Sequence, residues 1–224
     1  MYGVFIENYL SMTLFYNLYV VIAFKYCIIV FMKPEYEKII EPPERSFTAK
    51  IVNRDNRPLL SQAWHFHPEI EICYTSKSNG RRFVGNQISD YQEKDLVMFG
   101  ANLPHGFTTE EYSSQVVIQM TFDFLGEKFI NSPELRPIKK LFSHAKRGLA
   151  FKGKTKKKAI KIIDKLIENE GSFQLLYLLE LLHLLAKSAD IQEICSEEYA
   201  LNFEVEQFGR IKIVYDHKYA NKCS

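Results

Sequence analysis

Polar side chains alternate with bulky ones between Trp64 and Ile72. This period of two is typical of a β-strand, in which residues two apart share a face. One face then carries two imidazoles and two carboxylates, those of His65, His67, Glu69 and Glu71. Because such groups are costly to bury unless they are bound, this face must line a pocket, hold a metal ion or meet water.

A second histidine segment supports a pocket. The short apolar run 95–99 predicts a strand, and the turn-rich stretch 100–106 brings His105 to the start of the next strand. Three imidazoles and one carboxylate suit zinc, iron, manganese or nickel. The alternative is a cavity whose polar residues hydrogen-bond one another or an organic effector.

These residues resemble the two sequence motifs of the cupin fold. The first motif is matched by His65, His67 and Glu71, with one residue fewer than usual before the glutamate, and the second by His105, without its usual Pro-x-Gly and final Asn. The resemblance implies a double-stranded β-helix, or jelly-roll, barrel in which these four side chains converge. The resemblance implies that these four residues are the metal ligands. A divalent metal ion is the one cofactor we consider.

Glu69 and Arg82 complete the predicted ligand pocket. Glu69 shares the strand face of the histidines and is a candidate general acid or base beside a metal. The ordinary alternative is a solvated carboxylate, or one paired with Arg81 or Arg82 on the returning strand. We expect the pocket to sense a ligand rather than to turn over a substrate.

Composition describes a globular protein. The chain has 224 residues, 46% of them hydrophobic and 25% charged, with a net charge of +2 that argues neither for nor against nucleic acid. The cysteines are scattered and unpaired by any CxxC spacing, which favours reduced thiols and a cytoplasmic location.

Residues 10–31 are almost wholly apolar and long enough to span a membrane. Three interpretations stay open: a membrane anchor, a packed accessory element, or translated sequence upstream of a start at Met32. We favour the last and keep the anchor as the alternative.

Short predicted strands fill the chain up to residue 124, and helical patterns follow. The segments expected to be helical are 125–129, 135–145, 155–169 and a leucine-rich helix at 173–189. A helix apolar on most sides must be buried between layers or against a partner. The fold class predicted is therefore mainly β plus α, with a cupin-like barrel followed by a helical segment.

The order of these parts resembles the AraC family of bacterial transcription regulators. The matching segments are 65–69, 80–85, 95–105, 147–151 and the leucine-rich helix. The resemblance implies a sensor barrel at 33–125, a helical linker or dimerisation segment at 126–205, and the truncated start of a DNA-binding domain at 206–224, after a hydrophobic extension at 1–32 that composition alone indicates.

The resemblance also implies the partners. They are a small-molecule effector such as a sugar, a second copy bound through helix 173–189, and DNA bound only through a C-terminal helix-turn-helix domain that we expect to be cut short here. The predicted function is thus the effector-sensing and dimerisation portion of a regulator, not an enzyme. The competing prediction is a small metal-dependent cupin enzyme, an isomerase or dioxygenase.

Overall fold

The computed structural model describes residues 34–40, 44–54, 64–109, 112–196 and 198–199. The predictions for residues 1–32, including the apolar stretch 10–31, and for residues 206–224 lie outside these ranges. The chain divides into Met1–Pro34 and Glu35–Ser224, and every element named below belongs to the second unit. Within the described ranges, no helix is long and apolar enough to cross a membrane.

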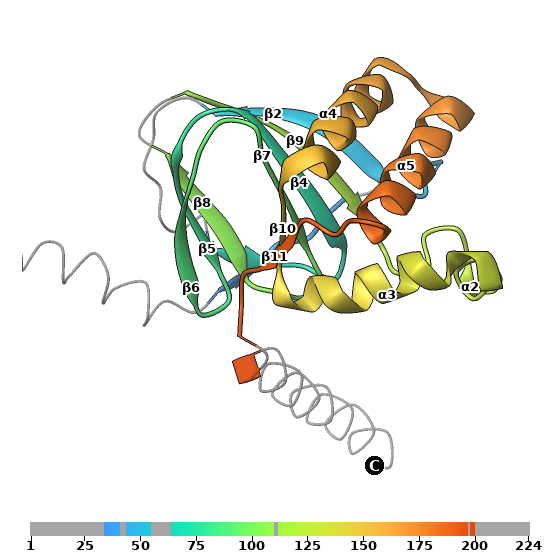
Figure 1. Ribbon diagram of the computed structural model, residues 1–224, viewed down its shortest axis with the longest axis horizontal. Helices are drawn as coiled ribbons and strands as arrows, with labels where there is room; N and C mark the ends of the chain where they lie inside the picture. Colours follow the sequence, from blue (N-terminus) through green and yellow to red (C-terminus); the bar gives the residue numbers. More distant parts are fainter. Residues whose placement is uncertain (1–33, 41–43, 55–63, 110–111, 197, 200–224) are drawn as a thin grey trace, which may run out of the picture. The chain divides into compact units, whose positions relative to one another are not determined.

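The strands form two sheets that face each other (Figure 1). The five-stranded sheet has the order β1 (Glu35–Tyr36), β3 (His65–Phe66), β8 (His105–Thr109), β5 (Gly80–Val84) and β6 (Gln87–Tyr91). The six-stranded sheet has the order β11 (Ile191–Glu193), β10 (Leu149–Phe151), β7 (Asp95–Phe99), β4 (Ile70–Lys77), β9 (Ser113–Met120) and β2 (Thr48–Arg54). Neighbours pair antiparallel, except that β1 lies parallel to β3.

Alternation along β4 divides the apolar side chains between two cores. Cys73 faces the space between the sheets, where it belongs to a cluster with Val84 of one sheet and Val97 of the other. Ile72 and Tyr74 point to the opposite side and join a larger core shared with the helices. One strand therefore contacts both the barrel interior and the helical layer.

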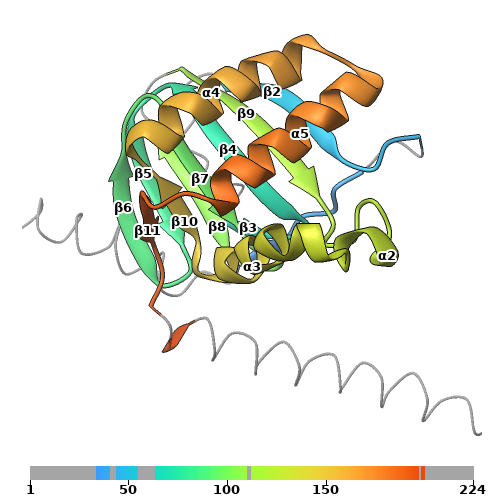
Figure 2. The same ribbon diagram turned by 45° about the vertical axis from the view of Figure 1, so that its right-hand side comes forward.

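The helical part consists of α2 (Glu127–Ile130), α3 (Arg136–His144), α4 (Gly153–Glu168) and α5 (Gly171–Ala186), with single 3₁₀ turns η2 (Pro133–Leu135) and η3 (Ala145–Arg147). Figure 2 shows α4 and α5 side by side across the outer face of the six-stranded sheet. The two helices run antiparallel because only Asn169 and Glu170 separate them. Their buried faces, with Ile163 on α4 and Leu182 on α5, complete the outer core.

The predicted class is confirmed: a cupin-like, jelly-roll β barrel followed by helices. One predicted element is wrong in detail, since the strand expected across 64–72 is two strands in different sheets. Strand β3 ends at Phe66 and β4 begins at Ile70, so residues 67–69 cross between the sheets. Pro68 lies in this crossing, where its missing N–H costs no ladder hydrogen bond.

The six-stranded sheet also extends beyond the expected end of the barrel at residue 125. Strands β10 and β11 come from the segment predicted to be a helical linker, and β10 pairs with β7. Each has three residues, which is too short for a periodic pattern to show. Part of the segment 126–205 is therefore built into the barrel sheet.

Candidate metal centre

His65, His67 and His105 meet, although two separate segments supply them. His65 of β3 lies directly opposite His105 of β8 in the antiparallel pairing. The ring centroid of His105 is 4.4 Å from that of His65 and 5.0 Å from that of His67. A backbone hydrogen bond of 2.7 Å from Asn102 N–H to the carbonyl of His67 ties the two segments together.

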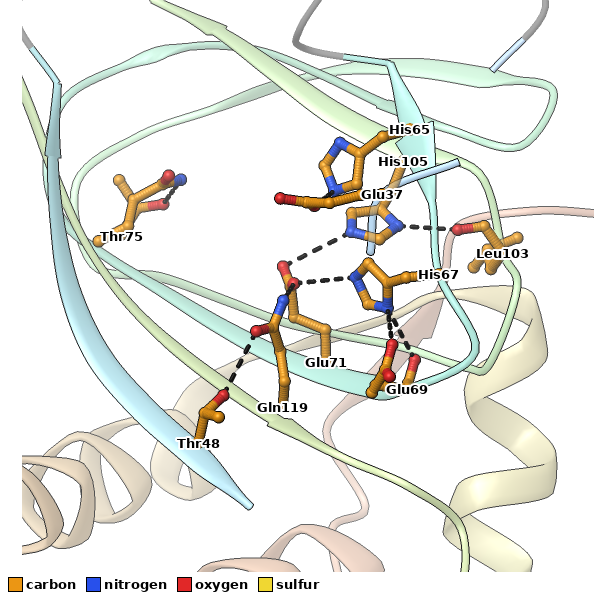
Figure 3. A network of polar contacts seen from close by, with 11 residues as sticks. Glu37, Thr48, His65, His67, Glu69, Glu71, Thr75, Leu103, His105 and Gln119 are labelled. Carbon is orange, nitrogen blue, oxygen red and sulfur yellow. Dashed lines mark hydrogen bonds and ion pairs between the residues drawn. The ribbon is translucent and has the colours of Figure 1, made fainter. Parts of the chain in front are cut away.

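Glu71 approaches the three rings from the facing sheet. Its Oε2 lies 3.2 Å from Nε2 of His67, and its Oε1 lies 3.6 Å from Nε2 of His105 (Figure 3). One donor atom from each of His65, His67, Glu71 and His105 lies within 4.8 Å of the other three. The cluster therefore bridges the two sheets at the point where the chain crosses between them.

Backbone carbonyls orient two of the rings. Nδ1 of His105 lies 2.8 Å from the carbonyl of Leu103, and Nδ1 of His67 lies 3.2 Å from the carbonyl of Glu69. A carbonyl only accepts, so each Nδ1–H is the donor, and the Nε2 of a neutral ring carries a lone pair. Both lone pairs point toward Glu71, and a proton or a cation must lie between them and the carboxylate.

This donor set fits a divalent metal ion. Nε2 of His105 is buried and has no hydrogen-bond partner among the residues that the structure describes. Metal-binding histidines usually donate their other ring N–H to a carbonyl or carboxylate, as His67 and His105 do. Ligand atoms about 2.0–2.2 Å from an ion lie within roughly 4.4 Å of one another, so the cluster needs sub-ångström adjustments to close around one.

A glutamine that the sequence reasoning missed holds the carboxylate in place. Nε2 of Gln119 donates to Oε2 of Glu71 over 2.8 Å, and Oγ1 of Thr48 donates to the amide oxygen of Gln119 over 3.4 Å (Figure 3). Gln119 sits opposite Glu71 in the β4–β9 register. The available signal was a glutamine within the otherwise apolar run 116–120.

Glu69 and Arg82 lie apart from the bridging donors. Glu69 is buried beside His67, with Oε2 3.3 Å from Nδ1, the nitrogen that faces away from Glu71. Arg82 forms an ion pair with Asp95 and donates from Nε to Ser89 over 3.0 Å. The alternative that Glu69 is solvated or paired with Arg82 is therefore wrong, because Glu69 is buried beside His67 and Arg82 pairs with Asp95.

Burial and mutual charge shift the pKa values of the cluster. Burial disfavours the charged form of His67, but the hydrogen bond and the negative charge of Glu71 outweigh it and raise the pKa of His67. Burial likewise opposes ionisation of Glu71, but the nearby His105 and His67 hold its pKa well below the ordinary value. For His65, burial and then the charge of His105 lower the pKa to about 3.

The low pKa of His65 predicts acid sensitivity in the metal-free protein. His65 stays neutral in the fold but takes up a proton when unfolded below its ordinary pKa of 6.5. Acidification from about pH 6.5 to about pH 5 is thus expected to cost on the order of 1–2 kcal/mol of unfolding free energy. The stability that protonated His67 contributes is already present below pH 6.5, because its pKa is raised in the fold. The stability that ionised Glu71 contributes is lost only below pH 4.5, because its pKa is lowered in the fold. Neither group therefore cancels the pH dependence caused by His65.

Urea unfolding across this window, with a chelator present, measures the slope. His65→Gln should flatten it, because the amide does not titrate. Equal slopes for wild type and His65→Gln would show that His65 is not the group responsible.

The fold and the cluster together define a cupin-like β barrel with a three-histidine, one-carboxylate site between its sheets. No protein-family model matches the sequence. No curated protein matches it significantly.

Solved structures show weak, partial similarity. An oxalate decarboxylase from Bacillus subtilis aligns over 35% of this chain and 22% of its own, with 20% identity and a TM-score of 0.30. A cupin 2 conserved barrel domain protein from Rhodopseudomonas palustris aligns over 37% and 57%, with 16% identity and a TM-score of 0.29. ToxT from Vibrio cholerae aligns over 61% and 54%, with 11% identity and a TM-score of 0.40. Each alignment spans less than two thirds of the matched chain.

Proposed function

We propose that this barrel is the effector-sensing domain of an AraC-type transcription regulator, and that a divalent metal ion forms part of its effector site. The observation that carries the proposal is the convergence of His65, His67, Glu71 and His105 from both sheets. Two of these rings are already oriented by backbone carbonyls, as metal ligands are.

The chain's own residues would prepare the site for the ion. Leu103 and Glu69 present carbonyls that accept from Nδ1, so Nε2 is the nitrogen of each ring that would bind the ion. Gln119 restrains Glu71 through Oε2, the oxygen beside His67, and leaves Oε1 facing His105. A bound divalent ion supplies positive charge and Lewis acidity, which attract an anionic or hydroxyl-bearing effector.

Strand β4 connects this site to the helices. Glu71 points into the barrel, whereas its neighbours Ile70 and Ile72 are buried in the core shared with α4 and α5. A ligand that draws Glu71 toward the histidines of the facing sheet therefore acts on a strand packed against the helices. Such a ligand shifts the population between two helix arrangements if it binds one of them more tightly.

The exposed end of α5 supports a second copy as partner. Phe173 and Leu176 are 62% and 58% exposed, while Leu178 and Leu182 are fully buried within the domain. The proposed dimer contact is thus narrower than the whole leucine-rich helix. It involves the residues of α5 that are not buried in the core of the domain.

Metal analysis and thermal unfolding test this function. We expect the purified protein to bind about one equivalent of Mn²⁺ or Zn²⁺ and to gain about 3 kcal/mol of stability at a hundredfold excess over Kd. Absence of binding to either ion, with stabilisation by sugars or other organic molecules alone, would favour a metal-free sensor.

The second candidate is a metal-dependent enzyme, because three histidines and a carboxylate also serve catalytic metals. Turnover of a small molecule that requires stoichiometric metal and is lost in His67→Ala would favour the enzyme. We expect binding without turnover.

A further inference from the structure

Glu37 reaches the cluster from a segment to which the sequence assigned no role. Strand β1 pairs in parallel with β3 through hydrogen bonds from Glu35 N–H to the carbonyl of Trp64 at 3.1 Å, and from Glu37 N–H to that of Phe66 at 3.0 Å. This pairing places Oε2 of Glu37 3.1 Å from Nε2 of His65 (Figure 3). A second carboxylate therefore contacts one of the four candidate ligands.

Charge balance favours a role for this carboxylate in metal binding. Three neutral imidazoles and Glu71 leave a divalent ion with one uncompensated positive charge. The site is largely buried, with His67, Glu71 and His105 at 1%, 5% and 1% exposure, so an uncompensated charge there is costly. Glu37 supplies a negative charge on the side of His65 Nε2, whereas the buried carboxylate of Glu69 lies on the Nδ1 side of His67, away from Glu71.

We propose that Glu37 is a fifth ligand of the metal ion, and that metal binding thereby holds residues 35–37 against β3. This inference rests on the metal site proposed above. Five protein ligands suit a six-coordinate ion that keeps one position for water or an effector, whereas a closed zinc site has four.

The weak attachment of β1 makes it responsive to such a ligand. The strand has two residues, both exposed, and the side chain of Glu37 is 49% exposed. Contacts of this kind open locally at low free-energy cost. A bond between Glu37 and the ion adds a contact present only in the metal-bound state, so ion binding and closure of this segment stabilise each other.

The ordinary alternative is a simple hydrogen bond. If neutral His65 carries its proton on Nε2, that N–H donates to Glu37, and the same nitrogen is then unavailable as a ligand. The two interpretations predict opposite effects of removing the carboxylate charge. If Glu37 is a ligand, removing its charge weakens binding of the ion. If Glu37 only accepts a hydrogen bond from His65, removing its charge leaves binding unchanged or improves it.

Two variants distinguish a metal ligand from a simple hydrogen bond. They are Glu37→Gln and its matched control Glu35→Gln, which removes the same charge from the same short segment. Affinities for Mn²⁺ and Zn²⁺ are measured separately by titration against a competing chelator. We expect Glu37→Gln to bind one or both ions about tenfold or more weakly. Glu35→Gln should stay within about twofold, because an exposed charge that does not touch the ion is screened.

Hydrogen exchange supplies a second measurement. Mn²⁺ should slow exchange of the Glu35 and Glu37 amides in the wild type and not in Glu37→Gln. Unchanged affinity in Glu37→Gln, or equal losses in both variants, would overturn the assignment of Glu37 while leaving the four-residue site intact. A wild-type protein that binds neither ion would instead remove the metal site itself, and Glu37 as a ligand with it.

Discussion

Replacing Glu71 by glutamine is expected to lower the affinity for a divalent metal ion by about a hundredfold or more, with the fold retained. Glu71 is the one donor of the cluster that comes from the six-stranded sheet, and its two oxygens face Nε2 of His67 and Nε2 of His105. The glutamine keeps the shape and one carbonyl oxygen but removes the negative charge. A neutral amide cannot replace a carboxylate in compensating a divalent ion.

Glu69→Gln is the matched control for this variant. It makes the same chemical change in a second buried carboxylate, only two residues away. Glu69 contacts Nδ1 of His67, on the side away from the shared donors, so its loss should weaken metal binding by less than about tenfold. Isothermal titration with Mn²⁺ and Zn²⁺ measures both variants, and circular dichroism checks that each is folded.

The comparison separates ligation from general electrostatics. If the two variants lose affinity equally, the effect of Glu71 comes from charge in the neighbourhood rather than from a bond to the ion. If Glu71→Gln binds as tightly as the wild type, the four-residue centre is wrong.

The sequence predicted this cluster through an argument that is only partly correct. Alternation placed His65, His67 and Glu71 on one side of a single strand, but the structure divides that strand between two sheets. The residues converge nonetheless, because residues 67–69 cross from one sheet to the other. The period of two thus predicted which side chains face the barrel interior. It could not reveal the crossing between sheets, because inward-facing residues of both strands point into the same interior.

The sequence could not predict the side chains that distant strands bring to the candidate ligands. Gln119 meets Glu71 only through the β4–β9 register, and Glu37 meets His65 only through a parallel pairing of two residues. Neither register is encoded in a local pattern that one sequence displays. By contrast, the helices at α4 and α5 were predicted to within a few residues, because apolar spacing over several turns is a local and redundant signal.

The leucine-rich helix is the case in which composition left the outcome open. A helix apolar on most sides can be buried by its own domain or by a partner. In the structure one side of α5 is buried in the outer core, and Phe173 and Leu176 stay exposed. The core role therefore falls to the buried residues of α5 and the proposed dimer contact to the exposed ones, so substitutions can separate the two.

Leu182→Ala is expected to lower the unfolding free energy by about 2–5 kcal/mol, because it leaves a cavity in a packed core. Leu182 is fully buried and belongs to the cluster that joins α5 to α4 and to the outer face of β4. The same chemical change at Leu176, which is 58% exposed, should alter the unfolding free energy by less than about 0.5 kcal/mol. Urea denaturation followed by circular dichroism, at a protein concentration held constant, measures both variants.

The exposed residue should instead control assembly. Leu176→Lys places a charge on the apolar end of α5, and we expect it to shift the proposed dimer toward monomer in analytical ultracentrifugation while the monomer stays folded. A dimer that persists in Leu176→Lys would move the dimer contact away from α5. Equal destabilisation by Leu182→Ala and Leu176→Ala would mean that Leu176 is buried in solution, as a constitutive interface would require. The pattern expected here, a large folding effect at 182 and an assembly effect at 176, follows from the two faces that α5 presents.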